Sequence, residues 1–393
     1  MKKIIELKVE QLVECLLYKI RTDTPNLISG GLYNGEFGSL IFLSYYSKYK
    51  NDSNLETTIH CYVEKLLENL VKCVSSHTFC SGYSGVLYLF DFLKDENLLY
   101  IDYKESQSMI EDYIILSMER DISDNNYDFL HGVLGCGYYF LKNNNDNVIQ
   151  CIIDFLFDIS IFIEKKNTIC WKSKIDGKGK KGYNIALSHG MASIILFLSC
   201  LIDKGIKNEK IYKLLHGGIN YILSQEIDVN KFGSFFPSQS LENGDSISRS
   251  RLAWCYGDLG IAYSFWRAGK ITSNAILEKK ALDMFFYSTK RISVESSGVV
   301  DAGLCHGSTG IAMIFRRMYL NTGCDTYYEA TNFWIEKTLN YACFNDGLAG
   351  YKTYIYPKWE LDYSLLTGIS GIGLMLLSYL LNDRQSWDKM FLL

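Results

Sequence analysis

A short pattern, two glycines separated by two residues, recurs along this chain of 393 residues and limits the folds that it can adopt. The copies begin at Gly35, Gly82, Gly132, Gly190, Gly257, Gly307 and Gly368. In the fourth copy Ser193 replaces the second glycine. Successive first glycines are 47, 50, 58, 67, 50 and 61 residues apart, a spacing typical of repeats that each consist of two helices. We therefore expect one repeated architecture rather than several unrelated domains.

A strongly apolar segment follows each glycine pair. These segments cover residues 40–46, 86–93, 138–141, 194–201, 261–266, 311–320 and 372–381. A helix that is apolar on nearly all faces belongs in a protein interior rather than on a surface. The sequence therefore predicts seven inner helices.

An amphipathic segment precedes each glycine pair. These segments cover residues 7–20, 55–74, 108–119, 148–164, 211–226, 276–291 and 327–342. Apolar residues at intervals of three and four, as in Leu12, Leu16 and Ile20, give a helix one buried stripe and one solvated face. The sequence therefore predicts seven outer helices.

Alternating outer and inner helices predict an all-α fold, either an open solenoid or a closed two-layer ring. An open array needs polar terminal repeats, whereas inner helices that are apolar all round need neighbours on both sides. We therefore expect an α/α toroid of seven outer and seven inner helices, in a single domain that spans residues 1–393. The longer spacers, residues 167–184 and 228–249, are the candidates for small insertions.

The charge of the chain argues against nucleic acid as a partner. With 44 acidic and 40 basic residues and a net charge of −4, the chain lacks the positive field that binding to a phosphate backbone needs. Its apolar segments are shorter than the roughly 20 residues that cross a bilayer, and its N-terminus lacks the apolar stretch of a signal peptide. Twelve scattered cysteines without a Cys-x-x-Cys pair fit a reducing compartment. We expect a cytoplasmic protein that does not span a membrane.

Two of these cysteines and one histidine have the composition of a metal site. Cys255 lies two residues before Gly257, and the adjacent pair Cys305 and His306 directly precedes Gly307. Two thiolates and one imidazole suit Zn²⁺, and three protein ligands leave the fourth position of a tetrahedral ion open for a substrate. The sequence therefore predicts a catalytic zinc site rather than a closed structural one.

Trp254-Cys-Tyr-Gly257 and Cys305-His-Gly307, in this order and within the glycine repeats, resemble the LanC family of lanthionine synthetase cyclases over residues 31–381. The resemblance implies an α/α toroid that binds Zn²⁺ through Cys255, Cys305 and His306. It also implies an activity: closing thioether rings in ribosomally made peptides by adding cysteine thiols to dehydroalanine or dehydrobutyrine.

The resemblance further implies four active-site residues, namely His189, Asp128, Arg251 and Tyr256. Addition of a thiolate to a dehydro residue creates an enolate, and His189 can act as the acid or base near neutral pH. Asp128 would orient or charge this histidine, and Arg251 would offset the enolate charge or hold Asp128. The alternatives are a core histidine at 189, a structural salt bridge of Asp128 and Arg251, and a packing role for Tyr256. His131 and Cys136 match no ligand of the family.

The function expected from these features is that of a stand-alone cyclase in lantibiotic biosynthesis. Its substrate would be a dehydrated precursor peptide, and a separate dehydratase and a peptide exporter complex at the inner membrane would be its partners. One alternative is a LanC-like enzyme that adds glutathione to dehydroamino acids in proteins, and another is a non-enzymatic peptide-binding scaffold stabilised by zinc. A toroidal glycosidase would need two carboxylates such as Asp258 and Asp301 at one cavity, and the thiol and imidazole groups have no place in that mechanism.

Overall fold

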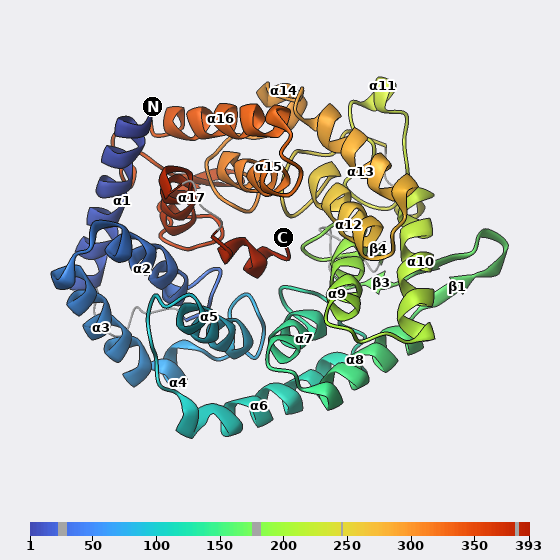
Figure 1. The fold of residues 1–393 in the computed structure, drawn as a ribbon, viewed down its shortest axis with the longest axis horizontal. Helices are drawn as coiled ribbons and strands as arrows, with labels where there is room; N and C mark the ends of the chain where they lie inside the picture. Colours follow the sequence, from blue (N-terminus) through green and yellow to red (C-terminus); the bar gives the residue numbers. More distant parts are fainter. Residues whose placement is uncertain (23–29, 175–181, 245–246, 382–384) are drawn as a thin grey trace. The chain divides into compact units, whose positions relative to one another are not determined.

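The computed structural model describes residues 1–22, 30–174, 182–244, 247–381 and 385–393, and helices predominate (Figure 1). The chain divides into two compact units. One unit consists of Met1–Ile114 and Val300–Lys389, and the other of Ile115–Val299 and Met390–Leu393. Among the described helices, none has the length and apolarity needed to cross a membrane. That the whole chain forms a single domain stays a prediction.

All the predicted inner helices are present. They are α2 (Ser39–Lys50), α5 (Tyr83–Asp95), α7 (Val133–Lys142), α9 (Met191–Asp203), α12 (Asp258–Ile271), α15 (Ser308–Thr322) and α17 (Ile369–Leu381). Most of their side chains are buried on every face, as the continuous apolar composition predicts. The first glycine of the repeat is the N-cap residue of α5, α7, α9, α12 and α15.

The predicted outer helices are present as well. They are α1 (Lys2–Thr22), α3 (Ser53–Glu68), α6 (Lys104–Ser123), α8 (Asp146–Asp158), α10 (Glu209–Leu223), α13 (Ala275–Ser288) and α16 (Asp325–Asn340). In α1 the buried residues Ile5, Val9, Leu12, Val13 and Leu16 form the single stripe expected of an amphipathic helix.

Five outer helices end earlier than predicted, and α3 and α8 differ most from the prediction. The segment predicted over residues 55–74 is interrupted at Asn69, and the short helix α4 (Leu70–Cys73) follows it. The segment predicted over 148–164 ends at Asp158, because the β-branched residues beyond it form strand β1 (Ile161–Ile163), paired with β2 (Thr168–Cys170).

Within each unit the helices pack in two layers. In the first unit α17 contacts both α15 and α2, while α16, α1 and α3 pack against α15, α17 and α2 respectively. In the second unit α9 contacts both α7 and α12, while α8, α10 and α13 pack against α7, α9 and α12 respectively (Figure 1). Each inner helix in these rows is therefore covered by its own outer helix.

Backbone hydrogen bonds join the loops that lead into the inner helices. In the first unit the N–H of Cys305 donates to the carbonyl of Leu366, the N–H of Leu366 to Tyr33, and the N–H of Tyr33 to Cys80. Each of these residues lies two positions before the first glycine of its repeat. In the second unit the N–H of Ser188, at the same position, donates to the carbonyl of Cys255. Equivalent positions of successive repeats are thus held side by side.

The spacers expected to hold insertions contain only small elements in their described parts. Besides β2, these are β3 (Lys172–Ser173), β4 (Gly182–Tyr183), α11 (Val229–Phe232) and the 3₁₀ turn η4 (Leu241–Asn243). Residues 175–181 and 245–246 of these spacers lie outside the described residues. The remaining short elements are η2 (Glu36–Gly38), η3 (Glu164–Lys166), α14 (Val294–Ser297), β5 (Thr353–Ile355), β6 (Lys358–Glu360) and η5 (Trp387–Phe391).

Candidate functional site

Cys255 lies on the short loop that enters α12. Its side chain is 6% exposed, and its carbonyl accepts hydrogen bonds from the N–H groups of Leu187 and Ser188. Gly257 ends this loop with φ at 94°, and a Cβ there would clash with the carbonyl oxygen of Arg251. A glycine is therefore needed for the chain to turn from Cys255 into the helix.

A buried ion pair holds the same loop in place. Asp258 is fully buried and accepts hydrogen bonds from the N–H groups of Phe235 at 3.1 Å and Phe236 at 3.0 Å. Arg291 Nη1 lies 3.1 Å from Asp258 Oδ2, and its guanidinium also donates to the carbonyl of Ser250. Burial raises the pKa of Asp258 to about 6, although the charge of Arg291 opposes this shift. The pair fixes both ends of the segment that carries Cys255.

Cys305 and His306 lie on the corresponding loop before α15. The N–H of Cys305 donates to the carbonyl of Leu366 at 2.8 Å. His306 Nε2 lies 4.0 Å from Oδ2 of Asp301, a carboxylate that is 2% exposed. A carboxylate beside one ring nitrogen orients a metal-binding histidine through its other nitrogen. Asp301 therefore neighbours His306, at a distance longer than that of a hydrogen bond.

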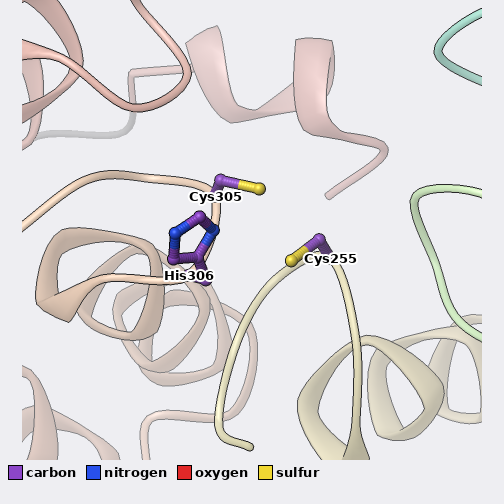
Figure 2. Close-up of side chains that lie close together, drawn as sticks. All are labelled: Cys255, Cys305 and His306. Carbon is purple, nitrogen blue, oxygen red and sulfur yellow. The ribbon is translucent and has the colours of Figure 1, made fainter. Parts of the chain in front are cut away.

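The structure brings the three predicted metal ligands together. One ligand atom from each of Cys255, Cys305 and His306 lies within 4.8 Å of the other two (Figure 2). A tetrahedral ion bound by sulfur and nitrogen holds its ligands roughly 3.5–3.8 Å apart, so a small adjustment suffices to bind one. Among the residues that the structure describes, the group includes no fourth His, Cys, Asp or Glu. The donor set thus fits Zn²⁺ with one coordination position open.

His189 and Asp128 form the second cluster. Nδ1 of His189 lies 2.7 Å from Oδ2 of Asp128, whose other oxygen accepts a hydrogen bond from the N–H of His131 at 2.7 Å. Burial alone would lower the pKa of His189, but the hydrogen bond and charge of Asp128 outweigh it and raise this pKa above its usual value. The imidazolium form is therefore favoured, and its proton on Nε2 points away from Asp128.

Two further rings border His189. The ring of Tyr256 lies 6.1 Å from that of His189, and the Tyr256 hydroxyl accepts a hydrogen bond from Nδ2 of Asn184 at 3.2 Å. Burial raises the pKa of Tyr256 to about 12, so its hydroxyl keeps its proton at neutral pH. The ring of His131 stacks on that of His189 with centroids 5.8 Å apart and planes at 15°.

Arg251 precedes Cys255 on the loop that leads to α12. Its side chain is exposed, and among the described residues no ion pair joins it to Asp128. A role for Arg251 at the enolate stays a prediction, as do the chemical roles of the other predicted residues.

Sequence reasoning gave no role at this site to His131, Asn184 or Asp301, although the repeat contains a pattern that could have identified the first of them. His131, His189, Tyr256 and His306 each directly precede the first glycine of a repeat. Since three of these positions were already assigned to the site, the fourth was a candidate by equivalence.

Comparisons with known proteins identify the family and the fold. A family model described as lanthionine synthetase C-like protein matches residues 28–392. The nisin biosynthesis protein NisC of Lactococcus lactis subsp. lactis is 23% identical in an alignment of 370 residues that covers 86% of each chain. The solved structure of a nisin cyclase superposes with a TM-score of 0.74 at 19% identity, covering 100% of this chain and 97% of that one. The fold predicted from the repeat, an all-α toroid, is thereby confirmed as that of nisin cyclase.

Proposed function

Because the chain belongs to the lanthionine synthetase C-like family, we propose that it is a zinc-dependent cyclase that forms lanthionine or methyllanthionine rings in a dehydrated precursor peptide. The close approach of the ligand atoms of Cys255, Cys305 and His306 is the observation that carries this proposal. The likeness to proteins named for nisin biosynthesis and nisin cyclisation supports a lantibiotic precursor as the substrate class. A separate dehydratase would supply this substrate, in the cytoplasm or in a complex with a peptide exporter at the inner membrane.

Cys255, Cys305 and His306 would hold the zinc ion, which when bound supplies Lewis-acid stabilisation of a substrate thiolate. An ordinary cysteine, with a pKa near 8.5, is only about 3% ionised at pH 7, so this stabilisation matters at neutral pH. Two protein thiolates in the set neutralise the charge of the ion and preserve the electron density on the incoming sulfur. The residues present therefore suit a site that activates a thiol.

His189 completes the reaction as an acid. When the substrate sulfur bonds to the β-carbon of dehydroalanine, the electron pair of the C=C bond moves into an enolate, and the α-carbon then needs a proton. Asp128 binds Nδ1 of His189 and raises the pKa of this histidine, which favours its cationic form, so Nε2 would be the atom that delivers this proton. Its side chain remains 16% exposed, which leaves a substrate access to the ring. The proton lost by the thiol balances the proton gained by the carbon, and the mass of the peptide stays unchanged.

Tyr256 and Arg251 have supporting roles in this proposal. The Tyr256 hydroxyl keeps its proton and faces Asn184, so it fixes the wall beside the His189 ring. The exposed guanidinium of Arg251 would offset negative charge on the bound peptide or its enolate. The glycosidase alternative is disfavoured, because Asp258 and Asp301 are both buried and both accept backbone hydrogen bonds.

Metal analysis and mass spectrometry test this function together. Cys255→Ala and Cys305→Ala proteins should remain folded, lose stoichiometric zinc and fail to consume the free thiol of a dehydrated peptide. Cys61→Ala, which removes an exposed cysteine from an outer helix, should keep both metal and activity. An increase in mass with glutathione would favour glutathione addition instead. Unfolding of the two ligand variants together with an inactive wild type would favour the zinc-stabilised scaffold.

A further inference from the structure

His131 lies beside the histidine that acts as the acid in the proposed function. Its ring stacks on that of His189, with centroids 5.8 Å apart and planes inclined by 15°. His131 directly precedes the first glycine of its repeat, as His189 and Tyr256 do, and the ring of Tyr256 borders His189 at 6.1 Å. The repeat therefore places His131 among residues already assigned to the site.

The loop before α7 fixes the backbone of His131 and leaves its ring available. The N–H of His131 donates to Oδ1 of Asp128 at 2.7 Å, and its carbonyl accepts a hydrogen bond from Nδ2 of Asn126 at 2.9 Å. Its side chain is exposed, and no residue in the described part of the chain hydrogen-bonds to its ring. A bound substrate can therefore hydrogen-bond to this ring.

The surroundings of the two stacked imidazoles favour opposite charge states. Partial burial lowers the pKa of His131, the charge of Asp128 opposes this effect, and the charge of His189 lowers the pKa further. For His189, burial is outweighed by the hydrogen bond and charge of Asp128, which raise the pKa. His131 is therefore neutral at neutral pH, and a neutral imidazole keeps one N–H donor. Neighbouring groups whose pKa values move apart in this way take different parts in a reaction.

The distance between the two rings suits two atoms of one enolate. In a dehydro residue the carbonyl oxygen lies about 2.4 Å from the α-carbon, given bond lengths of about 1.52 Å and 1.23 Å. A hydrogen bond of about 2.9 Å to this oxygen and a proton donor about 3 Å from the α-carbon can together span up to roughly 8 Å. Parallel rings with centroids 5.8 Å apart lie within this range. One ring can therefore contact the oxygen while the other protonates the carbon.

We propose that His131 is a further catalytic residue, whose ring N–H donates a hydrogen bond to the carbonyl oxygen of the dehydro residue as negative charge develops there. This inference rests on the proposed function, because the enolate belongs to that reaction. Sulfur bonds to the β-carbon, the electron pair of the C=C bond moves toward the oxygen, and His189 delivers the proton to the α-carbon. His131 neither gains nor loses a proton. A donor aimed at the atom where charge develops stabilises the transition state more than the bound substrate.

Three substitutions separate hydrogen bonding from ring stacking. His131→Phe keeps a ring against His189 but removes both nitrogens, whereas His131→Asn and His131→Gln remove the ring and keep an N–H donor. The assay uses the full-length zinc-loaded protein and a peptide with one dehydroalanine and one cysteine. His131→Phe should lower kcat about 10²- to 10³-fold, the loss typical of one missing oxyanion donor, and leave KM within about twofold. At least one amide variant should exceed the kcat of His131→Phe by about tenfold or more.

His216→Phe is the matched control, because His216 is also exposed and its ring stacks on a neighbour, Tyr212, but it lies on outer helix α10. This variant should keep the kcat of the wild type. In fluorescence anisotropy, a labelled peptide with alanine in place of dehydroalanine should bind every variant as it binds the wild type, since no charge develops on it. Zinc content should also be unchanged.

Wild-type kcat in His131→Phe would overturn the proposal. Equal losses in the Phe, Asn and Gln variants would also overturn it, because they would assign proton transfer rather than hydrogen bonding to the ring. Weaker binding of the alanine peptide by His131→Phe, in proportion to its loss of kcat/KM, would reduce His131 to a substrate contact. A wild type that consumes no thiol would refute the proposed function and this inference with it, whereas an active wild type matched by His131→Phe would refute only the role of His131.

Discussion

Removing Arg291 should destabilise the protein strongly, because it leaves a carboxylate buried without its partner. The side chains of Arg291 and Asp258 are 4% and 0% exposed, and their closest atoms are 3.1 Å apart. Removing one member of such a buried pair costs about 3–5 kcal/mol. We expect Arg291→Met to lower the free energy of unfolding by this amount at pH 8, a large share of the 5–15 kcal/mol typical of a folded domain.

The pH dependence follows from the pKa of Asp258. Burial raises this pKa to about 6 in the folded protein, above the value of about 3.9 in an unfolded chain. The folded state therefore binds the proton more tightly, and ionisation of Asp258 reduces the free energy of unfolding as the pH rises from about 4 to about 6. Since Arg291 opposes this shift, its removal raises the pKa further. The loss in Arg291→Met should consequently be smaller at pH 5 than at pH 8.

Urea unfolding followed by circular dichroism at the two pH values measures both effects. Lys290→Met, which removes an exposed neighbouring cation, should stay within about 0.5 kcal/mol of the wild type. The double variant Asp258→Asn/Arg291→Met should be more stable than Arg291→Met at pH 8, because it leaves no charge in the interior. A loss below about 1 kcal/mol at pH 8, or an equal loss at pH 5, would refute the account of this pair as a buried anchor.

Three further predictions concern the site. Asp128→Asn removes the charge that raises the pKa of His189. The alkaline limb of the profile of kcat/KM against pH, where the imidazolium is lost, should therefore move to lower pH. His189→Ala should reduce kcat/KM about 10²- to 10⁴-fold at all pH values. Protonation of His189 is also linked to folding. The pair stabilises the fold at low pH, and this stabilisation is lost as the pH rises through the raised pKa of His189. Asp128→Asn should therefore flatten the dependence of the free energy of unfolding on pH near neutrality. Chelation of zinc should abolish thiol consumption, and added Zn²⁺ should restore it, while the far-ultraviolet circular dichroism spectrum stays unchanged. Loss of the helical signal on chelation would show that the ion is structural and contradict a purely catalytic role. Gly257→Ala should lower the free energy of unfolding, measured with urea, by well over 1 kcal/mol, because a clash with the Arg251 carbonyl adds to the strain of a positive φ. Gly205 has φ at 85° and open surroundings, so Gly205→Ala should lower the free energy of unfolding only by the backbone strain.

The helices could be predicted from the sequence because burial alone determines their pattern. A segment such as α9, with buried side chains along nearly its whole length, needs no knowledge of its neighbours to be recognised as interior. Helix ends were less predictable. The apolar residues of β1 continue the composition of α8, and only pairing with β2, in the spacer that follows, distinguishes a strand from another helical turn.

The metal ligands were predictable because the repeat assigns them equivalent positions. Cys255 and Cys305 each lie two residues before a repeat glycine, where the backbone bonds to a neighbouring loop. Asn184 and Asp301 were not assigned to the site, because their contacts depend on side-chain directions that spacing does not reveal. The hydrogen bond from Asn184 to Tyr256 joins residues that are far apart in the sequence. Asp301 and His306 lie on the same loop, but their spacing does not show that their side chains approach each other.

The residues that lie six positions before a repeat glycine serve both the fold and the site. Asn184 and Asp301 each lie six residues before a repeat glycine, and their carbonyls accept the N–H of the first residue of α9 and α15. This backbone contact caps the helix whatever side chain is present, as it also does at Asp362 before α17. The side chains at these positions contribute to the fold as well, because Asn184 accepts a hydrogen bond from the N–H of Ala186 and Asp301 from that of Gly303. Substitutions there should therefore reduce stability as well as change the chemistry.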